Sequence, residues 1–264
     1  MEKEKKNITK IIMLVIALIL VIAILVTLCV GYAKKVTTKV QNPIATMEVE
    51  DYGTIKIELY PDKAPNTVTN FIKLANNGFY NGLKFHRVVK DFMIQGGDSS
   101  GDGSGSAKLK DLYQNEEDTA YSIEGEFNAN GYRKNDLNLT EGTIAMARAD
   151  YTQYSPSLAK QSYNSAGTQF FIMTTNNHTN LSGYYAGFGK VIEGMDVVKK
   201  IAEVKVKKAD NSEQTGNTEK SVPEKDVKIK SVTVETFGMD YGLPKTMTPF
   251  NYMNWLYSQY GISQ

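Results

Sequence analysis

The chain carries few side chains that could perform covalent or metal chemistry. It has one cysteine, Cys29, and two histidines, His86 and His178. One cysteine cannot form an internal disulfide or a multi-cysteine zinc site, and two histidines leave little for a histidine-rich metal centre. A phosphate-binding Walker sequence is absent. These residue types argue against a hydrolase or a metalloenzyme, and we expect no metal and no cofactor.

One loop matches a calcium-binding loop in part. Asp98, Ser100 and Asp102 stand at its first, third and fifth positions, and a glycine follows at the sixth. The twelfth position, which should supply a bidentate glutamate, is Leu109. Because this strongest ligand is missing, we interpret the segment as a flexible loop rich in glycine and serine.

The composition is that of an ordinary globular chain, whose helices and strands must position the remaining candidate residues. Its 264 residues are 41% hydrophobic and 22% charged, and the net charge is +1. This composition excludes a wholly disordered, collagen-like or disulfide-stabilised chain, and the near-neutral charge gives no drive toward nucleic acid. The length predicts one main domain of about 150–200 residues with appended segments.

The first appended segment is apolar. Residues 11–30 are twenty consecutive residues without a charge, and as a helix they would span about 30 Å, the hydrocarbon thickness of a bilayer. A cleaved secretory signal is the alternative, but its apolar core is usually only about 7–15 residues long. A slight excess of lysine in residues 1–10 favours a cytoplasmic N-terminus. We predict a single-pass anchor in the cell membrane, a stalk over residues 31–44, and the rest of the chain outside the cytoplasm.

Short alternating segments dominate the soluble part. Residues 46–59 alternate apolar and polar side chains around a central Asp-Tyr-Gly, which predicts a hairpin. The expected strands lie near residues 45–50, 54–59, 83–89, 92–95, 143–147, 169–174, 188–191 and 227–237. Helices are expected over residues 65–75 and 195–204, and exposed loops over residues 149–167 and 207–225. This pattern predicts a mainly β fold, a closed antiparallel barrel with helices at its ends.

Two segments have a specific pattern. Residues 85–98 read FHRVVKDFMIQGGD, and residues 168–172 read TQFFI. Both resemble the signature sequences of cyclophilins, a class of peptidyl-prolyl cis-trans isomerases. Further similarity lies in residues 125–127, 144–148, 164–167 and 188–195. The resemblance implies a closed eight-stranded antiparallel β-barrel capped by two helices, in a domain that we place at residues 45–238.

The chemistry that this resemblance implies is rotation about an X-Pro peptide bond. Rotation must break amide resonance, a barrier of about 18–20 kcal/mol. Acceleration from tens of seconds to milliseconds requires roughly 10⁴–10⁵-fold, or about 5–7 kcal/mol. No base, nucleophile or metal is needed. A dry pocket for the proline ring and a fixed donor at the prolyl nitrogen suffice, because that nitrogen gains a lone pair only as conjugation is lost.

The resemblance also implies which residues act. Arg87 matches the arginine donor of the family, although its local pattern alone would indicate a surface ion pair. Gln95 matches the glutamine that orients this arginine. His86 is interpreted as a structural, hydrogen-bonded histidine. The expected substrate-binding residues are Phe92, Met93, Ala147, Arg148 through its backbone, Gln169, Phe171, Leu181 and Tyr185; the apolar ones by type alone would be ordinary core.

The chain departs from the family pattern between residues 171 and 188. Tyr185 stands where many cyclophilins have a histidine, and its ring can still form a pocket wall. Asn180 stands at the position of a tryptophan that contributes to cyclosporin binding, so we expect weak cyclosporin binding. Arg148 replaces a frequent asparagine, which leaves a backbone contact available.

Three segments are additions to this pattern. Residues 108–120 are inserted in a loop near the pocket, and residues 207–225 lengthen the last connection. Residues 239–264 form an aromatic C-terminal extension, with a stretch that could become a short amphipathic helix. That extension either folds back on the domain or contacts a partner or a membrane surface.

The sequence therefore predicts a membrane-anchored isomerase that acts on X-Pro bonds of protein clients and assists their folding outside the cytoplasm. One alternative is a non-catalytic cyclophilin-like module that binds proline-containing segments as a chaperone at the membrane. Another is a scaffold whose C-terminal extension recruits partners.

Overall fold

The computed structural model describes residues 2–37, 41–115, 117–209 and 218–261 and divides into two units, Met1–Gln41 and Asn42–Gln264. The first unit contains one long helix, α1 (Glu2–Thr37), which continues into the segment predicted as a stalk. Its window Ile12–Cys29 has a mean hydropathy of 3.4, and its side chains are not buried. By length and composition this window satisfies the requirement for a membrane span, and a signal sequence satisfies the same requirement.

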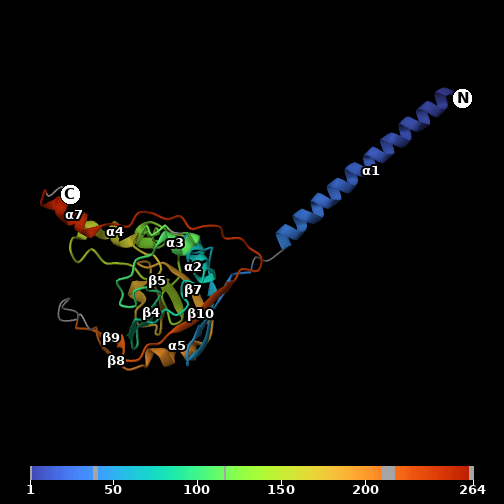
Figure 1. Ribbon diagram of the computed structural model, residues 1–264. Helices are drawn as coiled ribbons and strands as arrows, with labels where there is room; N and C mark the ends of the chain where they lie inside the picture. The colour runs from blue at the N-terminus through green and yellow to red at the C-terminus, as the bar shows by residue number, and fades with distance from the viewer. Residues whose placement is uncertain (1, 38–40, 116, 210–217, 262–264) are drawn as a thin grey trace. The chain divides into compact units, whose positions relative to one another are not determined.

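The second unit is built on a curled antiparallel sheet of eight strands (Figure 1). Their order across the sheet is β10-β1-β2-β7-β5-β6-β4-β3. The strands are β1 (Ile44–Val49), β2 (Gly53–Leu59), β3 (Arg87–Val89), β4 (Met93–Gly96), β5 (Thr143–Met146), β6 (Phe170–Met173), β7 (Gly187–Glu193) and β10 (Ile229–Glu235). The predicted hairpin at the start of the domain and the later strands are therefore confirmed, with small shifts at their ends.

The sheet does not close into the predicted barrel. Its two outer strands, β3 and β10, do not pair with each other in the described part of the chain. The segments that precede them meet at one isolated bridge, Lys84 to Lys228, supported by a hydrogen bond from the Phe85 amide to the Val227 carbonyl. Beyond this bridge β3 lies against β9 (Lys220–Pro223) instead. The pairing that would complete a barrel is thus replaced by a contact with an added hairpin.

Two helices lie at opposite ends of the curled sheet, as predicted: α2 (Pro65–Asn76) and α5 (Met195–Ala202) (Figure 1). The first turn of α2 has no side-chain cap of its own, since its N-cap residue is Ala64. The carboxylate of Glu126 takes this role from another part of the chain. It accepts from the backbone amide of Asn66 at 3.0 Å and from the amide and hydroxyl of Thr67, both at 2.8 Å. A buried carboxylate at a helix N-terminus satisfies orphan amides and interacts favourably with the helix dipole.

The added segments contain more regular structure than their composition indicates. The predicted exposed loop over residues 207–225 includes a two-stranded sheet, and the expectation of a loop is wrong there. Residues 210–217 lie outside the described part of the chain. The further elements are α3 (Leu109–Tyr113), η1 (Asn128–Asn130), η2 (Pro156–Leu158), α4 (Ala159–Tyr163), η3 (Thr179–Leu181), β8 (Val206–Lys208) and α7 (Tyr252–Gln259).

The C-terminal extension returns to the surface of the same unit. Asn66 and Lys245 exchange two hydrogen bonds, at 2.7 and 3.0 Å. The ring of Tyr252 in α7 packs on the ring of Tyr154, with centroids 4.4 Å apart. Of the two alternatives for this segment, folding back on the domain is therefore the one observed.

The buried apolar residues form two clusters on opposite faces of the sheet, because side chains alternate in direction along the strands. Phe170 belongs to a large core with Phe71 and Phe188, whereas its neighbour Phe171 belongs to a smaller cluster with Met93. Successive residues of a strand point to opposite faces of the sheet, so the pair Phe170-Phe171 serves both clusters at once. The smaller cluster forms the floor of the site described next.

Candidate active site

Three neighbouring strands, β3, β4 and β6, position the central residues of the site. Arg87 on β3 lies directly opposite Gln95 on β4, and Gln95 in turn lies opposite Phe171 on β6. Paired residues in an antiparallel sheet project to the same face. The two signature segments of the sequence are therefore brought side by side by strand register.

A cavity of about 90 Å³ lies over this face. This volume is roughly three times the ~30 Å³ share of one water in the liquid, a size suited to a small ring. The residues that line the cavity are Arg87, Phe92, Met93, Gln95, Ala147, Arg148, Phe171, Leu181 and Tyr185. The structure thus brings together every residue expected at the site except Gln169, which lines an adjoining cavity.

The walls of the cavity are apolar and partly aromatic. Phe171 and Tyr185 meet edge to face with ring centroids 5.5 Å apart, so the tyrosine forms a wall as expected. The rings of Phe92 and His178 pack at a tilt of 47° with centroids 4.4 Å apart, a contact that the sequence did not indicate. Leu181 packs against the same small cluster. A pocket with such walls favours an apolar ring.

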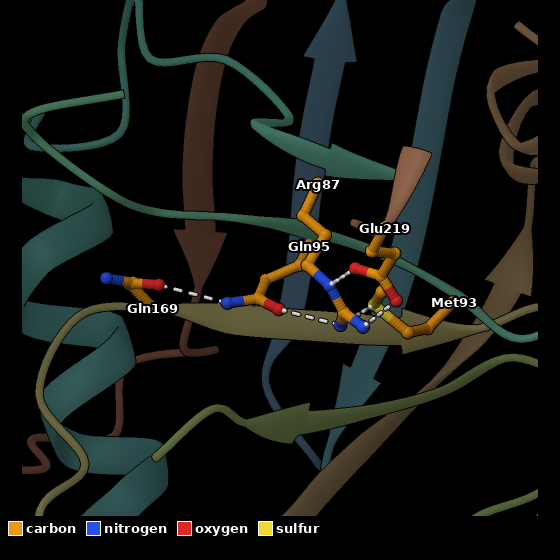
Figure 2. Close-up of polar contacts among 5 residues, drawn as sticks. All are labelled: Arg87, Met93, Gln95, Gln169 and Glu219. Atoms are coloured by element: carbon orange, nitrogen blue, oxygen red, sulfur yellow. Dashed lines mark hydrogen bonds and ion pairs between the residues drawn. The ribbon is translucent and has the colours of Figure 1, made fainter. Parts of the chain in front are cut away.

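Arg87 lines this cavity, and Figure 2 shows its guanidinium between Gln95 and Glu219. Its Nη1 lies 3.5 Å from Oε1 of Gln95 and 3.7 Å from the sulfur of Met93. Its Nε and Nη2 donate to the two carboxylate oxygens of Glu219, at 2.8 and 2.9 Å. The guanidinium carbon lies 5.8 Å from the centroid of the Phe92 ring, within the range of a cation–π contact.

A chain of amide side chains continues from Arg87 toward the glycine- and serine-rich loop. The Gln95 side chain accepts from Arg87 and donates to Oε1 of Gln169 at 3.0 Å (Figure 2). Gln169 then donates to the carbonyl oxygen of Gly103 at 3.1 Å. Each amide uses its acceptor on one neighbour and its donor on the next, so the orientation of Gln95 is fixed from both sides.

Arg148 has two different parts in the site. Its side chain lies over the aromatic walls, with the guanidinium carbon 4.5 Å from the Tyr185 ring centroid and 5.2 Å from that of Tyr163. The side chain also donates to the carbonyl oxygen of Tyr184 at 3.1 Å. The substitution of arginine for the family's asparagine therefore supports the pocket wall and leaves the backbone of residues 147–148 beside the cavity.

A second cavity of about 370 Å³ adjoins the first and shares Gln95, Ala147 and Arg148 with it. One side is formed by the glycine- and serine-rich loop, and the other includes Tyr151 and Phe250, whose ring centroids are 5.1 Å apart. The sequence did not place these two aromatic residues at the site. Their aromatic type was visible, but no local pattern shows that the C-terminal extension returns to this edge.

The glycine- and serine-rich loop is held by Asp98. This buried carboxylate accepts from the backbone amides of Asp102 and Gly103, at 2.9 and 2.8 Å. Among the described residues, no group of three or more histidine, cysteine, aspartate or glutamate side chains could hold a metal ion. Asp98 therefore has a structural task, the closure of its own loop.

His86 is buried beneath this loop, but the expectation that it is hydrogen-bonded is wrong. Neither ring nitrogen has a partner in the described part of the chain. A Cβ added at Gly103 would lie 3.8 Å from Nε2, so the loop covers the ring closely. Burial lowers the pKa of His86, with the adjacent Arg87 acting in the same direction and Asp98 opposing it. The imidazole is thus held neutral inside the domain.

Glu219 is a further residue of the site that could not be identified from the sequence. It precedes β9, inside a segment predicted to be an exposed polar loop, yet it binds Arg87 through two hydrogen bonds. Arg87 holds the pKa of Glu219 below its usual value by hydrogen bonding, and the Ser221 side chain contributes in the same direction. The sequence signal for the strands beside Glu219 was weak, because it consists of two short segments with valines, residues 204–206 and 222, separated by charged sequence.

Comparison with known proteins shows the family to which the chain belongs. The model of the family described as cyclophilin type peptidyl-prolyl cis-trans isomerase/CLD matches residues 44–234. A peptidyl-prolyl cis-trans isomerase of Acinetobacter baylyi is 40% identical over 188 residues, which cover 70% of this chain and 81% of the relative. Peptidyl-prolyl cis-trans isomerase B of Escherichia coli is 38% identical over 193 residues, 70% of this chain and 95% of the relative.

A solved structure shows the same fold. The Cryptosporidium parvum cyclophilin type isomerase, crystallised in the presence of the dipeptide Ala-Pro, superposes with a TM-score of 0.55 at 25% identity. The match covers 73% of this chain and 98% of that structure. The chain belongs to the cyclophilin-type peptidyl-prolyl cis-trans isomerase family, and its activity is the isomerisation of peptide bonds that precede proline.

Proposed function

We propose that Arg87 is the catalytic residue and that it acts by donating a hydrogen bond to the prolyl nitrogen as the X-Pro bond twists. The single observation that carries this role is the position of its guanidinium at the rim of the apolar cavity. A hydrogen bond from a donor fixed in this place becomes strong only when the nitrogen recovers its lone pair. The donor therefore binds the twisted state more tightly than either planar isomer.

The other residues support this step in two ways. Phe92, Met93, Phe171, Leu181 and Tyr185 enclose the proline ring and keep water from the rotating amide. Gln95 holds the Nη1 side of the arginine, with Gln169 behind it, and the backbone at residues 147–148 pairs with the bound peptide. No covalent bond changes, so the described residues supply binding, orientation and one directed donor.

The test is isomerisation of an X-Pro peptide by the full chain in detergent micelles, with the variant Arg87→Ala and the matched control Arg133→Ala. Arg133 is an exposed arginine away from the cavity. Loss of one donor aimed at developing charge reduces turnover by roughly 10²–10³-fold, and we expect a loss of this size for Arg87→Ala alone. Equal activity of Arg87→Ala and the wild type would remove Arg87 from the mechanism.

We propose that the clients are proline-containing polypeptides outside the cytoplasm and that residues 11–30 anchor the protein in the cell membrane. The crystallisation of the C. parvum relative with Ala-Pro supports proline-containing polypeptides as clients. The length and hydropathy of Ile12–Cys29 support the second. Residues 1–10 would then lie in the cytoplasm, and cleavage with release of the domain is the alternative.

Protease treatment of intact cells tests this topology. For an anchored protein outside the cytoplasm, added protease removes the domain from the cell-associated fraction, whereas a cytoplasmic control protein survives. A domain that is protected until the cells are lysed would place it in the cytoplasm. A domain recovered from the medium with a new N-terminus after residue 30 would establish the cleaved form.

We propose that cyclosporin binds weakly to the same site. Asn180 is exposed and does not line the cavity, so it offers no large ring beside the pocket. We expect the variant Asn180→Trp to bind cyclosporin more tightly than the wild type in a fluorescence titration. Tight binding by the wild type would contradict this expectation.

A further inference from the structure

The contact between Arg87 and Glu219 joins the edge of the sheet to the added hairpin. Figure 2 shows the contact of Arg87 with Glu219. Arg87 lies on β3, and Glu219 directly precedes β9, which packs against β3. Both nitrogens on one side of the guanidinium, Nε and Nη2, meet both oxygens of the carboxylate. Such a two-pronged pair fixes the plane of the guanidinium as well as its position.

The remaining side of the guanidinium is the side that faces the cavity. Nη1 lies against Gln95 and Met93, and both of these residues line the cavity. Glu219 is not among the described residues that line it. The carboxylate therefore holds the arginine from behind and does not occupy the space for the proline ring.

The surroundings of the pair favour a lasting contact over a transient surface one. The Arg87 side chain is 33% exposed and that of Glu219 is 37% exposed, so water screens the pair only in part. The Ser221 hydroxyl also hydrogen-bonds the carboxylate. A guanidinium tethered on both sides, by Glu219 and by Gln95, loses the rotamer freedom that a long arginine side chain otherwise has.

We propose that Glu219 is a positioning residue for the isomerisation: it clamps the Nε and Nη2 side of Arg87 so that the Nη1 side meets the prolyl nitrogen. This inference rests on the proposed role of Arg87. It assigns to the added segment, residues 207–225, a task in catalysis that a polar surface loop would not have. In this role Glu219 acts through Arg87 and makes no contact with the substrate.

The experiment compares Glu219→Gln, Glu219→Asp and Arg87→Ala in the full chain, in detergent micelles, by NMR exchange on an X-Pro peptide. Glu224→Gln is the matched control, because Glu224 is an exposed glutamate of the same hairpin. Circular dichroism and thermal melting identify any variant that fails to fold. The turnover number and KM are measured separately from peptide titrations at each pH.

Loss of orientation should lower turnover more than affinity. We expect Glu219→Gln to reduce the turnover number roughly tenfold while KM changes by less than about threefold, since misplacement of a catalytic group chiefly costs the reacting state. Glu219→Asp should restore part of the loss, and Glu224→Gln should match the wild type. A turnover number of Glu219→Gln equal to or above that of the wild type, while Arg87→Ala is inactive, would overturn the proposal.

The pH profile gives a second readout that a purely structural residue would not move. Turnover of the wild type should fall as the pH drops through the lowered pKa of Glu219, and this acid limb should disappear in Glu219→Gln. Arg87 on β3 is paired with the carboxylate, and Lys220, the first residue of β9, follows Glu219 in the chain. An acid limb that persists unchanged in Glu219→Gln would contradict the proposal. Full activity of Arg87→Ala would instead refute the proposed function itself.

Discussion

The cap that Glu126 provides for α2 permits a prediction of stability. The carboxylate is 5% exposed and accepts three hydrogen bonds from the first turn of the helix, on Asn66 and Thr67. In Glu126→Gln one oxygen becomes an NH₂ group, which cannot accept from the amide that it faces. The helix loses both a hydrogen bond and the negative charge at its positive end.

The size of the effect follows from these two losses. A buried amide left without a partner costs about 1–3 kcal/mol, and the loss of the charge at a helix N-terminus costs about 0.3–1 kcal/mol, more in a buried geometry. We expect Glu126→Gln to lower the free energy of unfolding by roughly 2–4 kcal/mol. For a domain of this size the melting temperature should fall by about 4–16 °C, at about 2–4 °C per kcal/mol.

Thermal and urea unfolding of the full chain, followed by circular dichroism, measure this change. Glu124→Gln is the control, because Glu124 is an exposed neighbour of the same charge. Isomerase activity of Glu126→Gln well below its melting temperature should remain close to that of the wild type, since Glu126 does not line the cavity. A destabilisation no larger than that of Glu124→Gln would refute the role of the buried carboxylate as the cap.

Three further predictions concern the pocket, the buried histidine and the extension. Leu181→Ala should lower kcat/KM roughly tenfold by widening the proline pocket, whereas the exposed Leu243→Ala should not; equal values in a peptide exchange assay would contradict this. Burial lowers the pKa of His86 in the folded chain, so as the pH falls the unfolded chain takes up the histidine proton before the folded chain does. The contribution of His86 to the free energy of unfolding should therefore be complete above about pH 6.5 and should decrease as the pH falls below it. In urea unfolding, the free energy of unfolding of His86→Asn should depend less on pH between pH 7 and 5 than that of the wild type. The same pH dependence in both proteins would argue against a buried neutral ring. Tyr252→Ala should speed limited proteolysis in residues 239–264, because it removes the ring contact that holds α7 to Tyr154, and an unchanged rate would show that other contacts hold it.

Much of the fold could be predicted because its signals are local. The hairpin of β1 and β2 follows from alternation around a tight turn, and α2 follows from a proline at its start and a regular apolar stripe. The site was accessible for a related reason. Its central residues lie in two short segments, and strand register places those segments side by side.

What could not be predicted depends on distant contacts. At the open edge of the sheet β3 packs against β9, and nothing in the sequences of the short strands β8 and β9 shows that they pair. Glu219 was missed because its partner lies far away in the sequence. The same reason applies to Glu126. Its segment, residues 125–127, could be recognised in the sequence, but its partners Asn66 and Thr67 could not.

The most direct test of the account is a measurement of binding and exchange together for Arg87→Ala. NMR titration gives the affinity of the full chain for an X-Pro peptide, and exchange spectroscopy on the bound peptide gives the isomerisation rate. If Arg87 stabilises the twisted bond, the affinity should change by less than about threefold while the rate falls by roughly 10²-fold or more. A rate that falls only in proportion to a loss of affinity, or a rate that does not fall, would contradict the central claim.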